Sequence, residues 1–219
     1  MKSLSRSLRF PFVLGFLLLA SLAAAAESKP VRVLFIGNSY LFGSGSSSRF
    51  FRPNTVTDLN QAKIGGVPAL FKSFTQAAGL AYDVHLELSS GQGFDYHLAK
   101  KSELIGQRWD LVVMQSFSLL DQAKPGDPAL MVRSAKALGE LFARFNPQVD
   151  IRLIATWPRA DAVYPETGHW HGKGIEGMAR DVRAAYDQAV KAARPGDKDP
   201  SPGPLAFLLA DVRGKLARL

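Results

Sequence analysis

Short apolar runs recur along the chain with longer, mixed stretches between them. The runs have the length of β-strands and occupy residues 31–36, 82–88, 111–115 and 151–156. Apolar residues at helical spacing lie between or after them, at residues 67–78, 95–105 and 128–145. Near-continuous apolar strands that alternate with helices predict an α/β fold, with a parallel sheet covered by helices on both faces.

The residues that follow each predicted strand are the first place to look for a site. In an open parallel sheet, the ligand crevice lies outside the carboxyl ends of the strands. Apart from a Trp-Pro pair, the residues at these ends are polar or glycine; they are 37–39, 89–93, 115–116 and 156–158. We therefore expect them to meet at one edge of the sheet.

Ser39 directly follows the first predicted strand and is preceded by a Gly-Asn pair. A serine hydroxyl at such a turn acts as a nucleophile only if a base removes its proton and an oxyanion site accepts the developing charge. Gly91 or Gly93 and Gln115 are the candidate donors for that oxyanion. The alternative is that Ser39 only caps the next helix, a common use of serine at this position.

Four segments resemble the conserved blocks of the SGNH (GDSL-like) hydrolases, in the order in which those blocks occur. Residues 33–40, VLFIGNSY, resemble the first block in the variant where Gly-Asn-Ser replaces Gly-Asp-Ser. Residues 90–97 resemble the second block, and residues 109–118 resemble the third, with Gln in place of the usual Asn. Residues 155–159 resemble a strand end that lines the cleft. The best match is to an exported bacterial group of this superfamily.

The resemblance implies a three-layer α/β/α sandwich with a central parallel sheet, the flavodoxin-like SGNH fold. It also implies ester hydrolysis through an acyl-serine intermediate, with no metal and no other cofactor. Ser39 is then the nucleophile, with Gly91 and Gln115 as oxyanion donors. The expected partner is a small, lipid or carbohydrate ester. The expected cleft residues are Asn38, Tyr40 and Trp157.

The catalytic base is the part of the resemblance that this sequence lacks. The superfamily takes its base from an Asp-x-x-His block near the C-terminus, but no histidine follows His171. His169 and His171, in residues 166–172, are the candidate bases in its place. An H-x-H pair also suits a metal, although no further convergent ligand is evident. We expect His85 to be a packed core histidine and His97 to bond within its own helix or loop.

Three explanations fit the missing block: a truncated domain, a frameshifted reading frame, and a protein that kept the cleft for binding. Under the last, the chain is a non-catalytic ligand-binding protein whose aromatic side chains stack on a sugar or another flat ligand. The aromatic candidates are Tyr40, Trp157, Tyr164 and Trp170, and the alternative is that they belong to the core or its rim. A nucleotide-binding domain is disfavoured, because the P-loop and G-x-G-x-x-G patterns are absent.

The N-terminus has the layout of a secretory signal peptide over residues 1–26, with a basic start, an apolar run and four alanines. Residues 27–219 suffice for a single domain. We therefore expect a secreted or periplasmic protein with no stable membrane insertion after cleavage, and an uncleaved N-terminal anchor is the alternative. Residues 205–219 are expected to form a final helix.

Charge and cysteine content narrow the remaining classes. The formal net charge is +8, but Lys and Arg are scattered without a basic run, so no nucleic-acid partner is expected. Cysteine is absent, which excludes disulfides, thiolate metal sites and cysteine catalysis. No feature of the sequence sets the oligomeric state.

Overall fold

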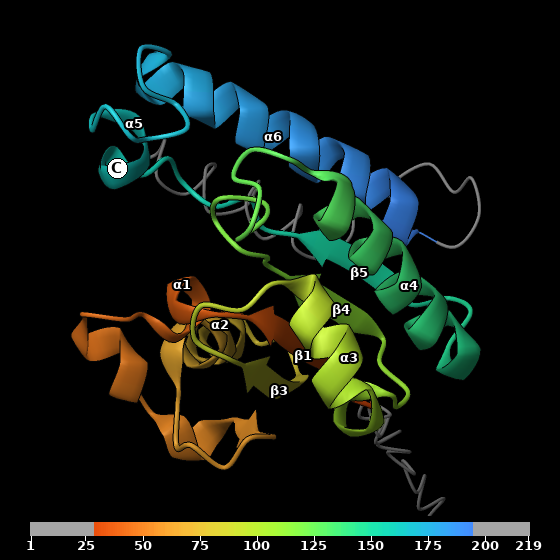
Figure 1. Ribbon diagram of the computed structural model, residues 1–219. Coiled ribbons are helices and arrows are strands. Elements are labelled where there is room, and N and C mark those ends of the chain that lie inside the picture. Colours follow the sequence, from red (N-terminus) through yellow and green to blue (C-terminus); the bar gives the residue numbers. More distant parts are fainter. Residues whose placement is uncertain (1–28, 195–219) are drawn as a thin grey trace, which may run out of the picture.

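The computed structural model describes residues 29–194, so the expectations for residues 1–26 and 205–219 lie outside it. A five-stranded parallel sheet lies at its centre, in the order β2-β3-β1-β4-β5 (Figure 1). The strands are β1 (Val31–Gly37), β2 (Thr57–Asp58), β3 (Tyr82–Leu88), β4 (Leu111–Met114) and β5 (Asp150–Leu153). The four longer strands are those predicted from the apolar runs, and the two-residue β2 was not predicted.

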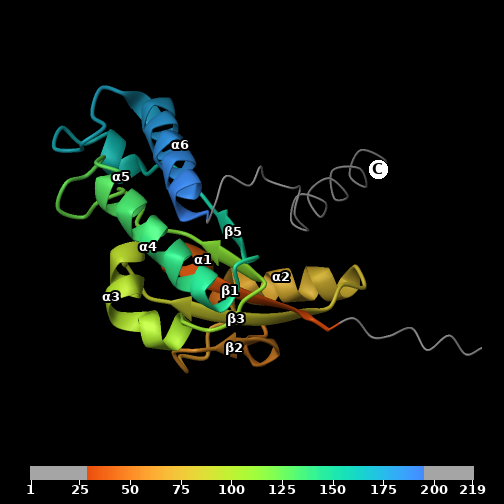
Figure 2. The ribbon, with the colours of Figure 1, turned by 90° about the vertical axis from the view of Figure 1, so that its right-hand side faces the viewer.

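Helices cover both faces of the sheet and complete the predicted α/β/α sandwich (Figure 1, Figure 2). The α-helices are α1 (Ser39–Phe42), α2 (Gly66–Ala77), α3 (Phe94–Ile105), α4 (Ala129–Phe145), α5 (Ala160–Val163) and α6 (Gly174–Ala193). Two 3-10 turns, η1 (Ser47–Phe50) and η2 (Pro53–Thr55), lie in the connection after α1. Helix α6 was not predicted, although its buried residues recur at helical spacing.

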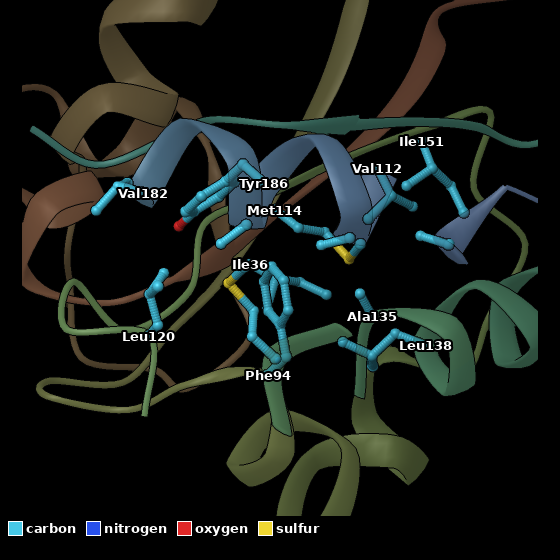
Figure 3. Packing of buried hydrophobic residues seen from close by; sticks show 14 of the residues in the cluster. Ile36, Phe94, Val112, Met114, Leu120, Ala135, Leu138, Ile151, Val182 and Tyr186 are labelled. Carbon is cyan, nitrogen blue, oxygen red and sulfur yellow. The ribbon is translucent and has the colours of Figure 1, made fainter. Parts of the chain in front are cut away.

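The alternation along β1 shows why both faces must be covered. Leu34 and Ile36 pack towards α3, α4 and α6, whereas Val33 and Phe35 pack towards α1 and α2. Figure 3 shows the first of these cores, where Ile36 lies among side chains of β4, α3 and α6. A strand that is apolar on both sides gains burial only when helices cover both sides, which is the arrangement of a parallel sheet.

Strand β3 departs from this pattern on the face towards α3. Its residues on that face are polar: Asp83, His85 and Glu87. The His85 ring packs edge-on against Trp109, with centroids 4.9 Å apart, and its Nε2 lies 2.9 Å from an Asp83 carboxylate oxygen. His85 is therefore packed as predicted, although it is only partly buried and belongs to neither hydrophobic core.

Two glycines bring α2 close to the loop that follows Ser39. A Cβ on Gly65 would collide with the Phe51 carbonyl oxygen, and Gly66 has a φ of +60° and touches the backbone of α1. Residues with side chains would push these segments apart.

Within residues 29–194, no helix is long and apolar enough to span a bilayer.

Candidate active site

The strand ends that the sequence singled out meet at one edge of the sheet. Ser89 N donates to Gly37 O at 2.9 Å, and Gln115 N donates to Ile36 O at 2.9 Å. The ends of β3 and β4 therefore flank the end of β1. Ser39, the first residue of α1, lies immediately beyond that central strand.

Asn38 ties the start of α1 to both neighbouring strand ends. Its Nδ2 donates to Gln92 O at 2.8 Å and to Ser116 O at 3.2 Å, while its Oδ1 accepts from Tyr40 N at 3.3 Å as the N-cap of α1. The residue is only 2% exposed. Asn38, expected in the cleft, instead lies beneath its surface, where it fixes the backbone that carries Ser39.

Gln115 makes similar internal contacts. Its Oε1 accepts from Asn38 N at 3.2 Å, and its Nε2 donates to Ser116 O. The Tyr186 hydroxyl of α6 accepts from Ser116 N at 2.9 Å and also bonds to the Gln115 side chain. Burial raises the pKa of Tyr186 far above its ordinary value, so the hydroxyl is neutral. In this arrangement the Gln115 amide holds other residues in place, and it would have to turn to reach an oxyanion.

The turn formed by residues 89–93, here called the glycine turn, joins β3 to α3. Gly91 is exposed at its crest with a φ of +69°, a conformation that favours glycine, and open space surrounds its missing Cβ. Gly93 is buried, and a Cβ there would lie 2.8 Å from an Asp95 carboxylate oxygen and 3.4 Å from Ser116 Oγ. Of the two candidate donors, Gly91 is therefore the accessible one.

A hollow of about 470 Å³ opens beside Ser39. The Tyr40 and Trp157 rings line it and pack against each other with centroids 4.3 Å apart, and Trp157 is 63% exposed. Both residues were expected in the cleft. The serine-rich segment 43–48 contributes three hydroxyls to the wall. The lining residues are Ser39, Tyr40, Gly43, Ser44, Ser46, Ser48, Val67 and Trp157.

The other two aromatic candidates differ from each other. Trp170 is fully buried, and its Nε1 donates to Asp181 at 2.8 Å. It is a core residue, which is the alternative expected for these aromatic side chains, and it does not stack on a ligand. Tyr164 is 67% exposed but does not line the hollow beside Ser39.

The two candidate bases, His169 and His171, contact residues other than Ser39. His171 Nδ1 lies 3.2 Å from Tyr164 O, and the His169 ring packs against Gly126 in the loop after β4. In the part of the chain that the structure describes, no histidine is hydrogen-bonded to the Ser39 hydroxyl. No contact in this part of the chain therefore identifies His169 or His171 as the base.

His97 has a partner that the sequence did not indicate. Its Nδ1 is hydrogen-bonded to Glu87 on β3, and both side chains are fully buried. The expectation that it bonds within its own helix or loop is wrong, because α3 crosses directly over the polar face of β3. Glu87 also accepts from Ser89 Oγ at 2.8 Å and from Asn60 Nδ2 at 2.9 Å.

Arg159 lies two residues after Trp157 and is held in place by two contacts. It forms an ion pair with Asp161, and its Nη1 donates to Ser118 Oγ at 3.2 Å. The bond to Asp161 raises the pKa of Arg159 and lowers the pKa of the Asp161 carboxylate.

Among residues 29–194, no three His, Cys, Asp or Glu side chains are grouped to hold a metal ion.

Comparison with known proteins identifies the fold. No family model and no curated protein matches the sequence. An SGNH hydrolase candidate from Slackia heliotrinireducens superposes with a TM-score of 0.50 at 20% identity, covering 84% of this chain and all of the other. A family 3 carbohydrate esterase from Clostridium thermocellum also gives 0.50, at 14% identity, covering 76% of this chain and 75% of its own.

The chain has the fold of the SGNH hydrolases. At these identities the likeness concerns the fold alone, and it agrees with the architecture that the sequence blocks imply. The SGNH fold of this chain places Ser39 at the end of its central strand β1, between the strand ends that carry Gly91 and Gln115.

Proposed function

We propose that this chain is an exported serine ester hydrolase that acts on a small, lipid or carbohydrate ester. The observation that carries the proposal is the position of Ser39, which lines an open hollow directly after the central strand, with the glycine turn beside it. The Ser39 oxygen attacks the ester carbonyl carbon, and the alcohol leaves with the proton taken from Ser39. Water then releases the acid and restores the serine.

We assign the oxyanion contact to the Gly91 backbone N–H, because that residue is exposed at the crest of the glycine turn. Gln115 supports this site through its bond to Asn38 N. The proposed base is His169 or His171. The other two histidines, His85 and His97, are already hydrogen-bonded to buried or half-buried carboxylates.

Labelling with a fluorophosphonate tests the proposal directly. We expect the folded protein to be modified at Ser39 and to hydrolyse p-nitrophenyl acetate, and Ser39→Ala to lose both properties, with a fall in kcat of at least about 100-fold. Ser47→Ala is the matched control and should keep both, because Ser47 is an exposed serine of the same connection that does not line the hollow. Turnover that survives Ser39→Ala would contradict the proposal.

A non-catalytic ligand-binding protein is the second candidate. It is supported by the Tyr40 and Trp157 pair that lines the hollow and by the absence, within residues 29–194, of a histidine bonded to Ser39. Aromatic faces beside serine hydroxyls suit a carbohydrate, which offers both apolar faces and hydroxyl groups. Turnover of p-nitrophenyl acetate that depends on Ser39 would exclude a purely binding role.

A further inference from the structure

A buried polar network lies behind the glycine turn. Glu87, at the end of β3, is fully buried, and its two carboxylate oxygens accept from three segments of the chain. The donors are Asn60 after β2, Ser89 in the glycine turn and His97 on α3. Lys101 Nζ in turn donates to Asn60 Oδ1 at 2.8 Å. One carboxylate therefore joins the connection after β2, the glycine turn and helix α3.

The carboxylate-imidazole pair has the chemistry of a catalytic base and its orienting acid, but its geometry does not suit that role. His97 Nε2 is closed off from solvent and has no hydrogen-bond partner. A base must lie within about 3.2 Å of the proton that it removes, directly or through one water. A buried nitrogen without a contact to Ser39 or to the hollow does not meet this condition.

The network does reach the candidate site through the backbone of the glycine turn. Ser89 Oγ anchors one end of the turn to Glu87 at 2.8 Å. At the other end, Gln92 O accepts from Asn38 Nδ2 at 2.8 Å, next to Ser39. Gly91, the proposed oxyanion donor, lies between these two fixed points.

We infer that Glu87 and His97 are positioning residues that hold the glycine turn, and with it the Gly91 N–H, in place against Ser39. This inference rests on the proposed function. Glu87 must be an acceptor towards all three donors, a task that an ionised carboxylate performs and an amide does not. In Glu87→Gln the new NH2 group would face either the Asn60 and Ser89 donors or His97 Nδ1, so the side chain no longer accepts from all three donors at once.

The test combines two measurements on the full chain, hydrogen-deuterium exchange of the backbone amides of residues 90–93 and ester turnover. The variants are Glu87→Gln, His97→Asn and Ser89→Ala, which removes only the link between the network and the turn. Ser102→Ala is the matched control, because Ser102 Oγ bonds within α3, to Leu98 O. We expect the three variants to speed exchange in the turn and to lower kcat roughly 10- to 100-fold with little change in KM, and the control to do neither.

Several outcomes would overturn the inference. Ser89→Ala with unchanged exchange and unchanged kcat would show that the network does not hold the turn. A His97→Asn variant that loses Ser39 labelling while the turn exchanges normally would make His97 a base instead of a positioning residue. If the parent protein does not react at Ser39, the proposed function fails, and the exchange data still decide whether the network fixes the turn. If Glu87→Gln does not fold, Ser89→Ala decides.

Discussion

At the scale of single residues, the surroundings of a side chain decide its role more than its type. Trp157 and Trp170 were both candidates for ligand stacking, yet one is 63% exposed above the hollow and the other is fully buried. The same contrast separates Ser39, which lines the hollow, from Asn38, whose amide groups are bonded to neighbouring strand ends. Of these two adjacent residues, Ser39 therefore faces the hollow and Asn38 supports the backbone that carries it.

Replacing Trp157 with Ala should weaken substrate binding with little effect on stability. The exposed ring contributes to the hollow, where an aromatic contact is worth about 0.5–1.5 kcal/mol, so we expect KM to rise by roughly 2- to 10-fold. Exposed positions usually change stability by less than about 0.5 kcal/mol. Steady-state kinetics and thermal unfolding measure the two effects.

Phe74→Ala is the control for this substitution. Phe74 is 65% exposed, close to the exposure of Trp157, but it lies on α2 outside the hollow. It should leave both KM and the unfolding temperature nearly unchanged. Equal effects of the two substitutions on KM would show that Trp157 does not contact the substrate.

At the scale of elements, the close contact of α4 with α6 depends on one glycine. A Cβ on Gly139 would collide with the Ala193 carbonyl oxygen at the end of α6. These two helices cover β4 and β5 with a shared core in which Tyr186 of α6 lies (Figure 3). The Tyr186 hydroxyl accepts from Ser116 N at the site. Displacing α6 should therefore disturb both stability and the Ser116 contact.

Gly139→Ala should destabilise the protein even though alanine favours helix. Overpacking costs about 1–3 kcal/mol, and a Cβ only 1.9 Å from a backbone oxygen belongs at the upper end of that range. The helix propensity of Ala returns at most about 1 kcal/mol, so we expect a net loss of about 2 kcal/mol in the free energy of unfolding. Glu140→Ala, at an exposed position on the same helix, is the control and should change stability by less than about 0.5 kcal/mol. Urea titration would contradict the packing argument if Gly139→Ala were as stable as the parent.

At the scale of the whole molecule, Glu87 links stability to pH. Burial by itself raises the pKa of Glu87, but the hydrogen bond and charge of His97, with the bonds from Asn60 and Ser89, outweigh it and hold the pKa below the ordinary value of 4.5. A carboxylate with a lowered folded-state pKa stabilises the fold above its unfolded-state value. That contribution is lost as the pH falls through the folded-state pKa.

Glu87→Gln should therefore be less stable than the parent at pH 7, by about 3–5 kcal/mol because one partner of a buried pair is removed. The difference should narrow as the pH is lowered below about 4.5. Urea unfolding at several pH values measures it, with Asp161→Asn at an exposed ion pair as the control that should change little. A difference that is the same at pH 7 and pH 3 would refute the linkage.

The sequence alone determined the layers of the fold and the place of Ser39. The spacing of apolar residues in a strand or helix reflects burial on one or both of its faces. This spacing can be recognised within a short segment of the sequence, so the four longer strands and three helices were predictable. The carboxyl ends of parallel strands share one edge, which also made the meeting of residues 37–39 with 89–93 and 115–116 predictable.

Only the tertiary structure decided which polar side chains face the hollow and which support it. Asn38, Gln115 and the Glu87–His97 pair are set by contacts between residues 10 to 78 positions apart. Periodicity within one element does not report such pairings, because a polar residue at a strand end looks the same whether its partner is a substrate or another strand. The buried network behind the glycine turn therefore appears only once β3 and α3 are packed together.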